Sequence, residues 1–171
     1  MMYLTTDSHL GHAKIIAYGR DPAYEQKILQ GWKQLTGADV LIHLGDFCIG
    51  QDARMHELYL QPLPCKKWLI RGNHDKKSLS WYLAHGWDAV AESLCLDIFG
   101  KQILLSHRPT EVLPPGVWNI HGHWHGNDHR QEESYAFYTT HHRAFALEDT
   151  HFRIIPLRTI VASLIDKDSM G

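Results

Sequence analysis

The chain has 171 residues, with 17 Lys+Arg against 19 Asp+Glu, so its formal net charge at pH 7 is −2. The length is close to the ~150 residues of one domain, so we expect residues 1–171 to form a single domain. The 44% hydrophobic content excludes a disordered chain, and the near-neutral charge excludes a protein that coats nucleic acid by overall basicity. The 14 histidines are several times the ordinary share, and because imidazole is the commonest metal-binding side chain, this composition favours a metal site.

Neither the cysteines nor the N-terminus indicates an extracellular protein. Cys48, Cys65 and Cys95 are odd in number and show no C-x-x-C spacing, which argues against a disulfide framework and a structural zinc site. Residues 1–7 lack the basic and apolar regions of a signal peptide. No stretch approaches the ~20 apolar residues of a membrane span. We therefore expect a soluble, cytoplasmic protein with no membrane partner.

Five short apolar runs each end abruptly in a polar cluster. Short runs rich in β-branched and aromatic residues are typical of buried strands. The runs and the clusters that follow them are 3–6 before Asp7-Ser8-His9, 40–44 before Gly45-Asp46, 68–70 before Arg71-Gly72-Asn73-His74-Asp75, 103–105 before Ser106-His107, and 117–120 before His121-Gly122-His123-Trp124-His125. Because ligands bind at the carboxyl ends of strands in open α/β sheets, we expect these clusters to converge on one crevice.

Helices are predicted between the strands. Residues 22–36 open with Pro22 and carry apolar residues near helical spacing. Residues 52–60 and 78–84 are shorter candidates, each with a polar residue placed to cap its start.

The second half of the chain is predicted to contain further strands. Residues 94–105, with Gly100-Lys101 in the middle, are typical of a hairpin. The tail 144–165 is predicted to hold one or two strands, of which 152–155 is the clearest. Early alternation of strands and helices, followed by hairpins, predicts an α/β protein whose strands become antiparallel later in the chain.

The polar clusters contain the donors that a pair of divalent ions needs. Two ions ~3.5–4 Å apart require a bridging oxygen ligand and several terminal ligands on each side. Mixed oxygen and imidazole donors suit manganese, iron, zinc or nickel better than calcium or magnesium. The available set comprises two carboxylates, one amide and four imidazoles: Asp7, His9, Asp46, Asn73, His107, His123 and His125.

Taken together, the clusters resemble the five motifs of the calcineurin-like metallophosphoesterase family, in the family's order. Any one motif occurs often by chance, whereas five in order, each after a predicted strand, are a specific signal. The motifs are Asp7-Ser8-His9, Gly45-Asp46, Gly72-Asn73-His74-Asp75, His107 and Gly122-His123-Trp124-His125. The opening Asp7-Ser8-His9-Leu10-Gly11-His12 is similar to a subgroup of small bacterial and phage phosphoesterases.

This resemblance implies a fold and a ligand set. The fold is an α/β sandwich in which two mixed β-sheets pack face to face with helices outside, in four αββα layers. Two divalent ions are implied, with manganese expected first and iron, zinc or nickel as alternatives. One ion is implied to be held by Asp7, His9, Asp46 and His125, and the second by Asp46, Asn73, His107 and His123, with Asp46 as the bridge.

The resemblance also implies hydrolysis of a phosphate ester, with Asp46 and His74 as catalytic residues. A hydroxide that bridges the ions is the implied nucleophile, because two cations lower the pKa of a shared water and neutralise the phosphate oxygens. His74 lies outside the metal shell in this scheme and protonates the leaving oxygen, since an imidazole with a pKa near ~6.5 can supply a proton. The alternative is that His74 only binds the phosphate or orients Asn73.

The candidate substrate-binding residues are Asn73, His74, His12 and Arg108. His12 could equally be a packed or capping loop residue. Arg108 could bind a substrate phosphate, and an exposed or ion-paired arginine is an equal alternative.

Three residues beside the motifs are expected to have structural roles. Asp75 is expected to cap the helix that starts near Ser78, with orientation of His74 as the alternative. Trp124 lies between two candidate ligands, so its ring should turn away from them into the core. His43, inside a predicted strand, is expected to be a buried histidine with its hydrogen bonds satisfied, or a partner of a metal ligand.

Departures from the protein-phosphatase pattern indicate the substrate class. The G-D-x-x-D-R-G motif of the related serine-threonine phosphatases is replaced here by Gly45-Asp46-Phe47-Cys48-Ile49-Gly50, which lacks the arginine. We therefore expect a phosphodiesterase-type or small-ester hydrolase, whose substrates include nucleotides or nucleic-acid-derived esters. The rival hypothesis is a catalytically idle scaffold that keeps the fold for protein binding. The sequence carries no signal for an oligomeric state.

Overall fold

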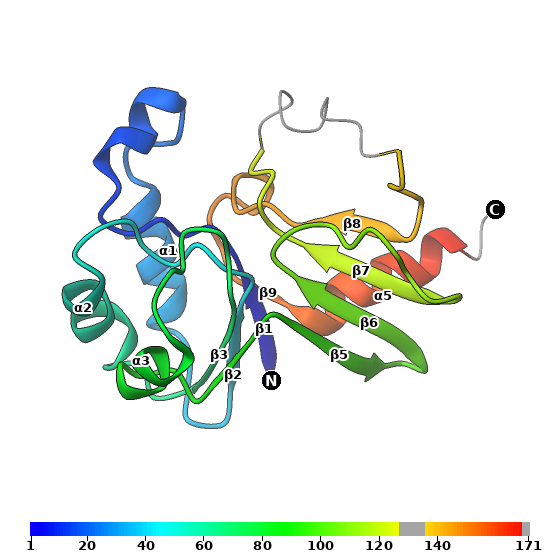
Figure 1. Cartoon of the computed structure of the whole chain (residues 1–171), viewed down its shortest axis with the longest axis horizontal. Helices are drawn as coiled ribbons and strands as arrows, with labels where there is room; N and C mark the ends of the chain where they lie inside the picture. Colours follow the sequence, from blue (N-terminus) through cyan, green and yellow to red (C-terminus); the bar gives the residue numbers. More distant parts are fainter. Residues whose placement is uncertain (127–135, 169–171) are drawn as a thin grey trace.

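Two β-sheets form the centre of the structure, and helices lie against them (Figure 1). The computed structural model describes residues 1–126 and 136–168 of the chain. The first sheet has the strand order β4-β3-β2-β1-β9 and the second has the order β5-β6-β7-β8. The strands of the first sheet are β1 (Met2–Thr5), β2 (Val40–His43), β3 (Lys66–Ile70), β4 (Ala89–Ala91) and β9 (Ile155–Pro156). Those of the second are β5 (Ser93–Ile98), β6 (Lys101–Ser106), β7 (Val117–His121) and β8 (His142–Ala144).

Both sheets are mixed. Strands β1 to β4 are parallel to their neighbours, and β9 joins β1 in the antiparallel direction. In the second sheet β5 and β6 are antiparallel, whereas β6, β7 and β8 are parallel. The prediction that later strands become antiparallel is therefore right for the β5–β6 pair and for β9, and wrong for the strands from β6 to β8.

The first sheet is buried on both faces, and this accounts for the short apolar runs in the sequence. Successive side chains of a strand point to opposite faces. Leu41 and Leu69 pack in a core cluster with the helices, while Ile42 and Ile70 pack in a second cluster with residues of the other sheet such as Ile103. Strands buried on both sides show continuous apolar runs in place of alternation.

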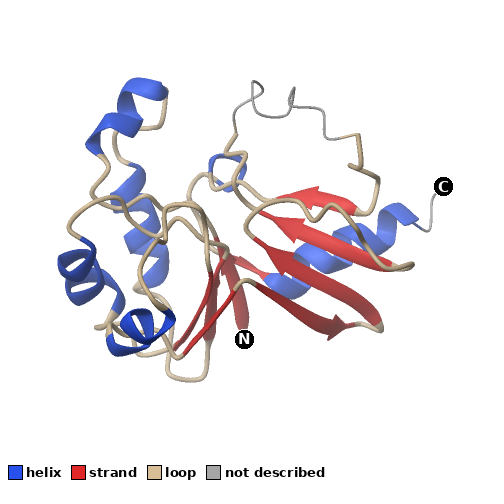
Figure 2. Ribbon diagram, in the orientation of Figure 1, coloured by secondary structure: helices blue, strands red, loops and turns tan. Residues whose placement is uncertain are grey.

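Helices α1, α2 and α3 cover the outer face of the first sheet (Figure 2). Tyr24, Ile28 and Trp32 recur every four residues along α1 (Tyr24–Trp32) and are all buried. Helix α2 (Asp52–Met55) continues into a π-helical turn, η2 (His56–Leu60), and α3 is Leu79–Ala84. The three helices predicted at 22–36, 52–60 and 78–84 are confirmed: α1 and α3 are shorter than predicted, and α2 with η2 spans the predicted 52–60.

The prediction of one or two strands in the tail 144–165 is right only for the short strand β9 and wrong for the rest of the tail. A 3-10 turn, η3 (Glu148–Thr150), is followed by the two-residue strand β9 and then by helix α5 (Leu157–Asp168). Four side chains at helical spacing in α5 enter the core between the sheets: Leu157, Ile160, Val161 and Leu164. Burying this one stripe stabilises a helix, although two of its residues, Ile160 and Val161, are β-branched.

The segment predicted as the clearest late strand, 152–155, is mostly irregular. Phe152 has φ 61° and is buried beside Tyr24, so the chain turns inward there before Ile155 pairs with Leu4 of β1. Strand β4 and a 3-10 helix, η1 (Ala13–Tyr18), were not predicted.

The hairpin predicted at 94–105 is confirmed as β5 and β6. Its two-residue turn is Phe99-Gly100, one position earlier than expected, because Ile98 pairs with Lys101. Phe99 and Gly100 have φ of 55° and 72°, as a type I′ turn requires.

The expected fold class, an α/β sandwich of two mixed sheets with flanking helices, is confirmed. Within residues 1–126 and 136–168, none of the helices combines the length and apolar character needed to span a bilayer.

His56, the first residue of η2, is a buried neutral histidine. Its Nδ1 donates to the Asp52 carbonyl at 2.7 Å, and its Nε2 accepts from the Trp87 indole at 3.0 Å. Burial lowers the pKa of His56 to about 4. The folded chain therefore binds a proton at this site only well below the usual range.

We expect His56 to make folding weaker in mild acid. The unfolded chain takes up a proton near pKa 6.5 and the folded chain near 4, so stability is lost as the pH falls through that window. Between about pH 7 and pH 5 the wild type should lose about 2 kcal/mol more unfolding free energy than His56→Gln. Urea titrations of both proteins at the two pH values measure this, and equal losses would contradict it.

Candidate functional site

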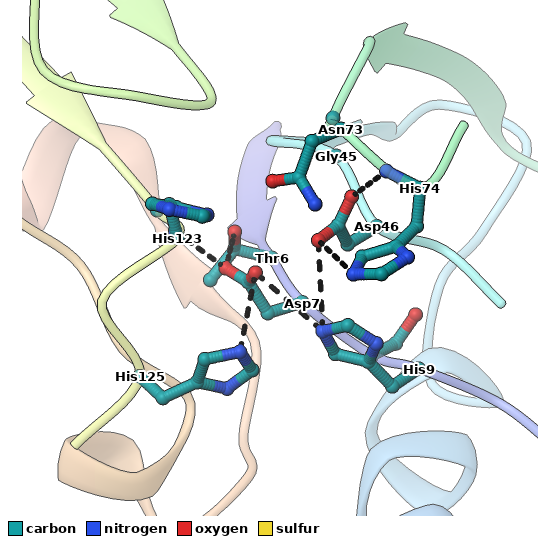
Figure 3. Close-up of polar contacts among 12 residues, drawn as sticks. Thr6, Asp7, His9, Gly45, Asp46, Asn73, His74, His123 and His125 are labelled. Atoms are coloured by element: carbon teal, nitrogen blue, oxygen red, sulfur yellow. Dashed lines mark hydrogen bonds and ion pairs between the residues drawn. The ribbon is translucent and has the colours of Figure 1, made fainter. Parts of the chain in front are cut away.

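The polar clusters meet where strands of both sheets end (Figure 3). Asp7 and His9 follow β1, and Asp46 follows β2. On the second sheet, His107 directly follows β6, while His123 and His125 follow β7. Each of these candidate ligands thus lies beyond the carboxyl end of a strand. As expected, the polar clusters come together at one junction of the two sheets.

Two compact groups of donors lie at this junction. In the first, Asp7 Oδ1 is 3.8 Å from His9 Nε2 and 3.6 Å from His125 Nε2. The three residues offer ligand atoms that all lie within 4.8 Å of one another, a spacing that could hold a metal ion.

The second group consists of Asp46, His107 and His123, with the same mutual spacing. His107 Nε2 is 3.5 Å from Asp46 Oδ2, 3.1 Å from His123 Nδ1 and 3.0 Å from Asn73 Oδ1. Its Nδ1 donates to the Leu44 carbonyl at 2.7 Å, so Nε2 is the ring nitrogen that faces the other members of the group.

Asp46 lies between the two groups. Its Oδ2 is 3.7 Å from His9 Nε2 in the first group, besides the contact with His107 in the second. Its Oδ1 accepts the backbone N–H of His74 at 2.8 Å, which fixes the orientation of the carboxylate.

Unsatisfied buried atoms show that this arrangement fits cations. Among the described residues, Asp7 Oδ1 and both ring nitrogens of His9 have no hydrogen-bond partner. Buried polar atoms without partners cost free energy, so such a set in a native structure indicates a ligand. Carboxylates and imidazoles turned toward the same points are suitable donors for divalent transition ions.

The protonation states favour the same conclusion. Burial alone would raise the pKa of Asp7, but the neighbouring imidazoles of His9, His125 and His107 hold it well below its ordinary value. Burial lowers the pKa of His9. At neutral pH the carboxylate is therefore charged and the imidazole neutral, and these are the forms that bind metals.

The backbone at these positions is strained. Left-handed φ values are uncommon outside glycine and concentrate at functional sites. Five candidate ligands have them: Asp7 (43°), His9 (45°), Asp46 (58°), His123 (70°) and His125 (52°).

Two motif glycines allow the loops to approach so closely. A Cβ on Gly72 would lie 2.2 Å from Asp46 Oδ1, and a Cβ on Gly122 would lie 2.1 Å from Thr6 Oγ1 and 2.6 Å from Asp7 Oδ2. Any side chain at either position would push a carboxylate out of place.

Asp75 joins the loops after β2 and β3. Its carboxylate accepts the backbone N–H groups of Asp46 at 2.7 Å, Phe47 at 3.2 Å and Gly72 at 2.8 Å. The predicted capping role is wrong, because Ser78 caps α3 with its own hydroxyl. Burial raises the pKa of Asp75 to about 6.

His74 and His12 lie on the open side of the groups. The His74 side chain is 45% exposed, and its Nε2 is 3.9 Å from Asp46 Oδ2. The rings of His74 and His12 lie 5.5 and 5.8 Å from the ring of His9, while Asn73 is exposed beside His107.

Arg108 is exposed, and its carbonyl accepts the Ser106 hydroxyl at 2.6 Å. Substrate binding by its guanidinium stays a prediction.

The two remaining expectations hold. Trp124 is buried, with its ring 4.7 Å from that of Tyr138 and thus packed in the core. His43 is fully buried and satisfied, since its Nδ1 accepts from Gly45 N at 3.1 Å and its Nε2 contacts Ser8 Oγ at 2.8 Å.

Sequence reasoning missed Arg20 and Glu148. Arg20 is 5% exposed and contacts the Asp7 carbonyl, Nδ1 of His125 and the Glu148 carboxylate. Burial alone would raise the pKa of Glu148, but His125 and Arg20 lower it to about 2. Neither residue stands in a motif, and Glu148 falls in the tail that was predicted as strand.

Comparison with known proteins identifies one family. A sequence model of the family described as Calcineurin-like phosphoesterase matches residues 2–155. An uncharacterized protein of Methanocaldococcus jannaschii, MJ1445, is 27% identical over 177 residues, which cover 97% of this chain and 92% of that protein.

Two solved structures are similar to this chain. The protein of unknown function AQ665 from Aquifex aeolicus has a TM-score of 0.71 and 28% identity, covering 95% of this chain and 98% of its own. The nuclease MPE of Pseudomonas putida has a TM-score of 0.49 and 26% identity, covering 72% of this chain and 61% of its own. The second likeness is too loose to carry an activity over to this chain.

We expect Asp75→Ala to destabilise the fold at the site. Three backbone N–H groups lose a charged acceptor, so the unfolding free energy should fall by about 3 kcal/mol. Asp88→Ala is the matched control, because this exposed carboxylate accepts only the Lys67 N–H among the backbone groups that the structure describes. Urea denaturation in the presence of a chelator compares the two, and similar losses would count against the role of Asp75.

Proposed function

The chain belongs to the calcineurin-like phosphoesterase family and is thus a metal-dependent phosphoester hydrolase, and we propose that it uses two ions to cleave phosphodiesters or small phosphate esters. The observation that carries the proposal is the position of Asp46, whose Oδ2 faces His9 of one donor group and His107 of the other. A two-ion site requires such a shared oxygen ligand.

The proposed ligands follow the two groups. Manganese is the first ion to test, with iron, zinc and nickel as alternatives, because the donors mix oxygen and imidazole nitrogen. One ion would be held by Asp7, His9, Asp46 and His125, and the other by Asp46, Asn73, His107 and His123. When bound, such ions would lower the pKa of a nearby water and neutralise charge on the phosphate oxygens.

His74 is proposed to hold the proton that the leaving oxygen receives. Its backbone is fixed by Asp46 Oδ1, and its half-exposed ring reaches the open side of the groups, where a substrate can approach. An imidazole nitrogen can carry a proton and release it to an alkoxide.

The substrate would approach the donor groups past exposed polar side chains, one of which, Asn73, is also a proposed ligand. Asn73 and His74 are exposed there and His12 is partly so, and they are proposed to contact the phosphate or its substituents. The proposal favours a diester or small ester over a phosphoprotein, since residues 45–50 lack the arginine of the protein-phosphatase motif.

Removal of a ligand tests the metal site. Asp46→Asn and His123→Ala should each lower kcat at least ~100-fold on an aryl phosphodiester and reduce the manganese retained per chain. Elemental analysis after gel filtration measures the retained metal. The exposed His151 offers a control, and His151→Ala should keep both activity and metal. A metal-free, inactive wild type would favour the idle-scaffold hypothesis.

A second variant tests the proton donor. His74→Ala should retain metal but slow esters with poor leaving groups far more than activated aryl esters, because only an alkoxide of high pKa needs the proton. Steady-state kcat on alkyl and aryl esters gives the comparison. His12→Ala, with its ring at a similar distance from His9, should affect both esters alike. If His74→Ala slows both alike, the donor role is wrong.

A further inference from the structure

Thr6 and Asp7 directly follow β1, and their side chains are hydrogen-bonded to each other (Figure 3). The Thr6 hydroxyl donates to Asp7 Oδ2 at 2.5 Å, and the backbone N–H of His123 donates to the same oxygen at 2.9 Å. Thr6 is fully buried and Asp7 is 1% exposed. One oxygen of this buried carboxylate is therefore held by two donors, one beside β1 and one on the loop after β7.

The other oxygen of Asp7 is the one that faces the first donor group. Among the described residues Oδ1 has no hydrogen-bond partner, and it lies 3.8 Å from His9 Nε2 and 3.6 Å from His125 Nε2. The two oxygens of a free carboxylate are equivalent, and the last torsion of an aspartate has a broad range. The hydrogen bonds to Oδ2 are what makes the two oxygens different here.

The position of the Thr6 hydroxyl is itself restricted. The loop after β7 packs directly against it, since a Cβ on Gly122 would lie 2.1 Å from Thr6 Oγ1. A hydroxyl that donates to a carboxylate makes a short, charge-assisted hydrogen bond, which is stronger than a bond between neutral groups. The hydroxyl can thus hold the carboxylate in one rotation.

We propose that Thr6 is a positioning residue: its hydroxyl holds Oδ2 of Asp7, so that Oδ1 is presented to the ion of the first donor group. Groups that hydrogen-bond a metal ligand commonly fix its orientation in this way, and their loss weakens metal binding. The inference rests on the proposed function, because it gives Asp7 the task of binding an ion.

The test separates the hydroxyl from the rest of the side chain. Thr6→Ser and Thr6→Ala both remove the methyl group, and only Thr6→Ala also removes the hydroxyl. Thr5→Ala is the matched control, because Thr5 is equally buried and its Oγ1 has no hydrogen-bond partner in the described part of the chain. Calorimetric titration of the metal-free proteins with Mn²⁺ needs no substrate and measures the affinity of each variant.

Thr6→Ala should bind Mn²⁺ about 10- to 100-fold more weakly than the wild type, whereas Thr6→Ser and Thr5→Ala should stay close to it. A role in folding alone would leave the affinity of the folded variants unchanged. A loss in Thr6→Ala no larger than the loss in Thr6→Ser or Thr5→Ala would overturn the inference and leave the proposed function standing.

A spectroscopic readout shows which ion is affected. Two neighbouring Mn²⁺ ions couple magnetically, so their electron paramagnetic resonance spectrum differs from that of a lone ion. At an Mn²⁺ concentration that just fills both groups of the wild type, Thr6→Ala should give the spectrum of a lone ion, held by the group of Asp46, His107 and His123. The spectrum of a pair in this variant would contradict the inference. A wild type that never gives the spectrum of a pair would instead overturn the proposed two-ion function.

A second variant covers the case in which Thr6→Ala does not fold. Thr6→Val replaces the hydroxyl with a methyl group, which keeps the branched shape but cannot donate to Asp7. Its Mn²⁺ affinity should also fall about 10- to 100-fold. Wild-type affinity in Thr6→Val would show that the hydroxyl does not position the carboxylate.

Discussion

A buried carboxylate at the junction of the two sheets, that of Asp46, is the group on which the site depends. It is 2% exposed, and a charge removed from water in this way is costly unless it meets positive or hydrogen-bonding partners. One oxygen is satisfied by a backbone N–H, while the other faces imidazoles from both donor groups. Asp75 and Gly72 hold the surrounding loops close enough for this geometry.

Much of the fold could be predicted because burial leaves simple patterns. Strands β1, β2 and β3 show apolar runs because both of their faces pack in the core. Helix α1 shows four-residue spacing because one of its faces does. The tail could not be predicted, because the β-branched residues Ile160 and Val161 favour strand locally. The segment is helical because one side of α5 packs against the two sheets, and this tertiary packing outweighs the local preference.

The convergence of the candidate donors could be predicted because each of them lies on the loop that follows a strand and the motifs occur in order. The roles of Arg20 and Glu148 could not be predicted, since their contact joins positions 128 residues apart through a partly buried charge pair. Asp75 lies in a predicted motif, but it does not have the predicted capping role. The backbone N–H groups that donate to its carboxylate lie on the loops after β2 and β3, and no local pattern records the approach of these two loops.

Each donor group draws on both sheets, with Asp7 and His9 opposite His125, and Asp46 opposite His107 and His123. An ion bound there would act as a crosslink between the two halves of the sandwich. Binding of the ion to the folded chain alone would raise the unfolding free energy. The increase would grow with the logarithm of the ion concentration. The melting temperature of the chain would then depend on the metal concentration, even with no substrate present.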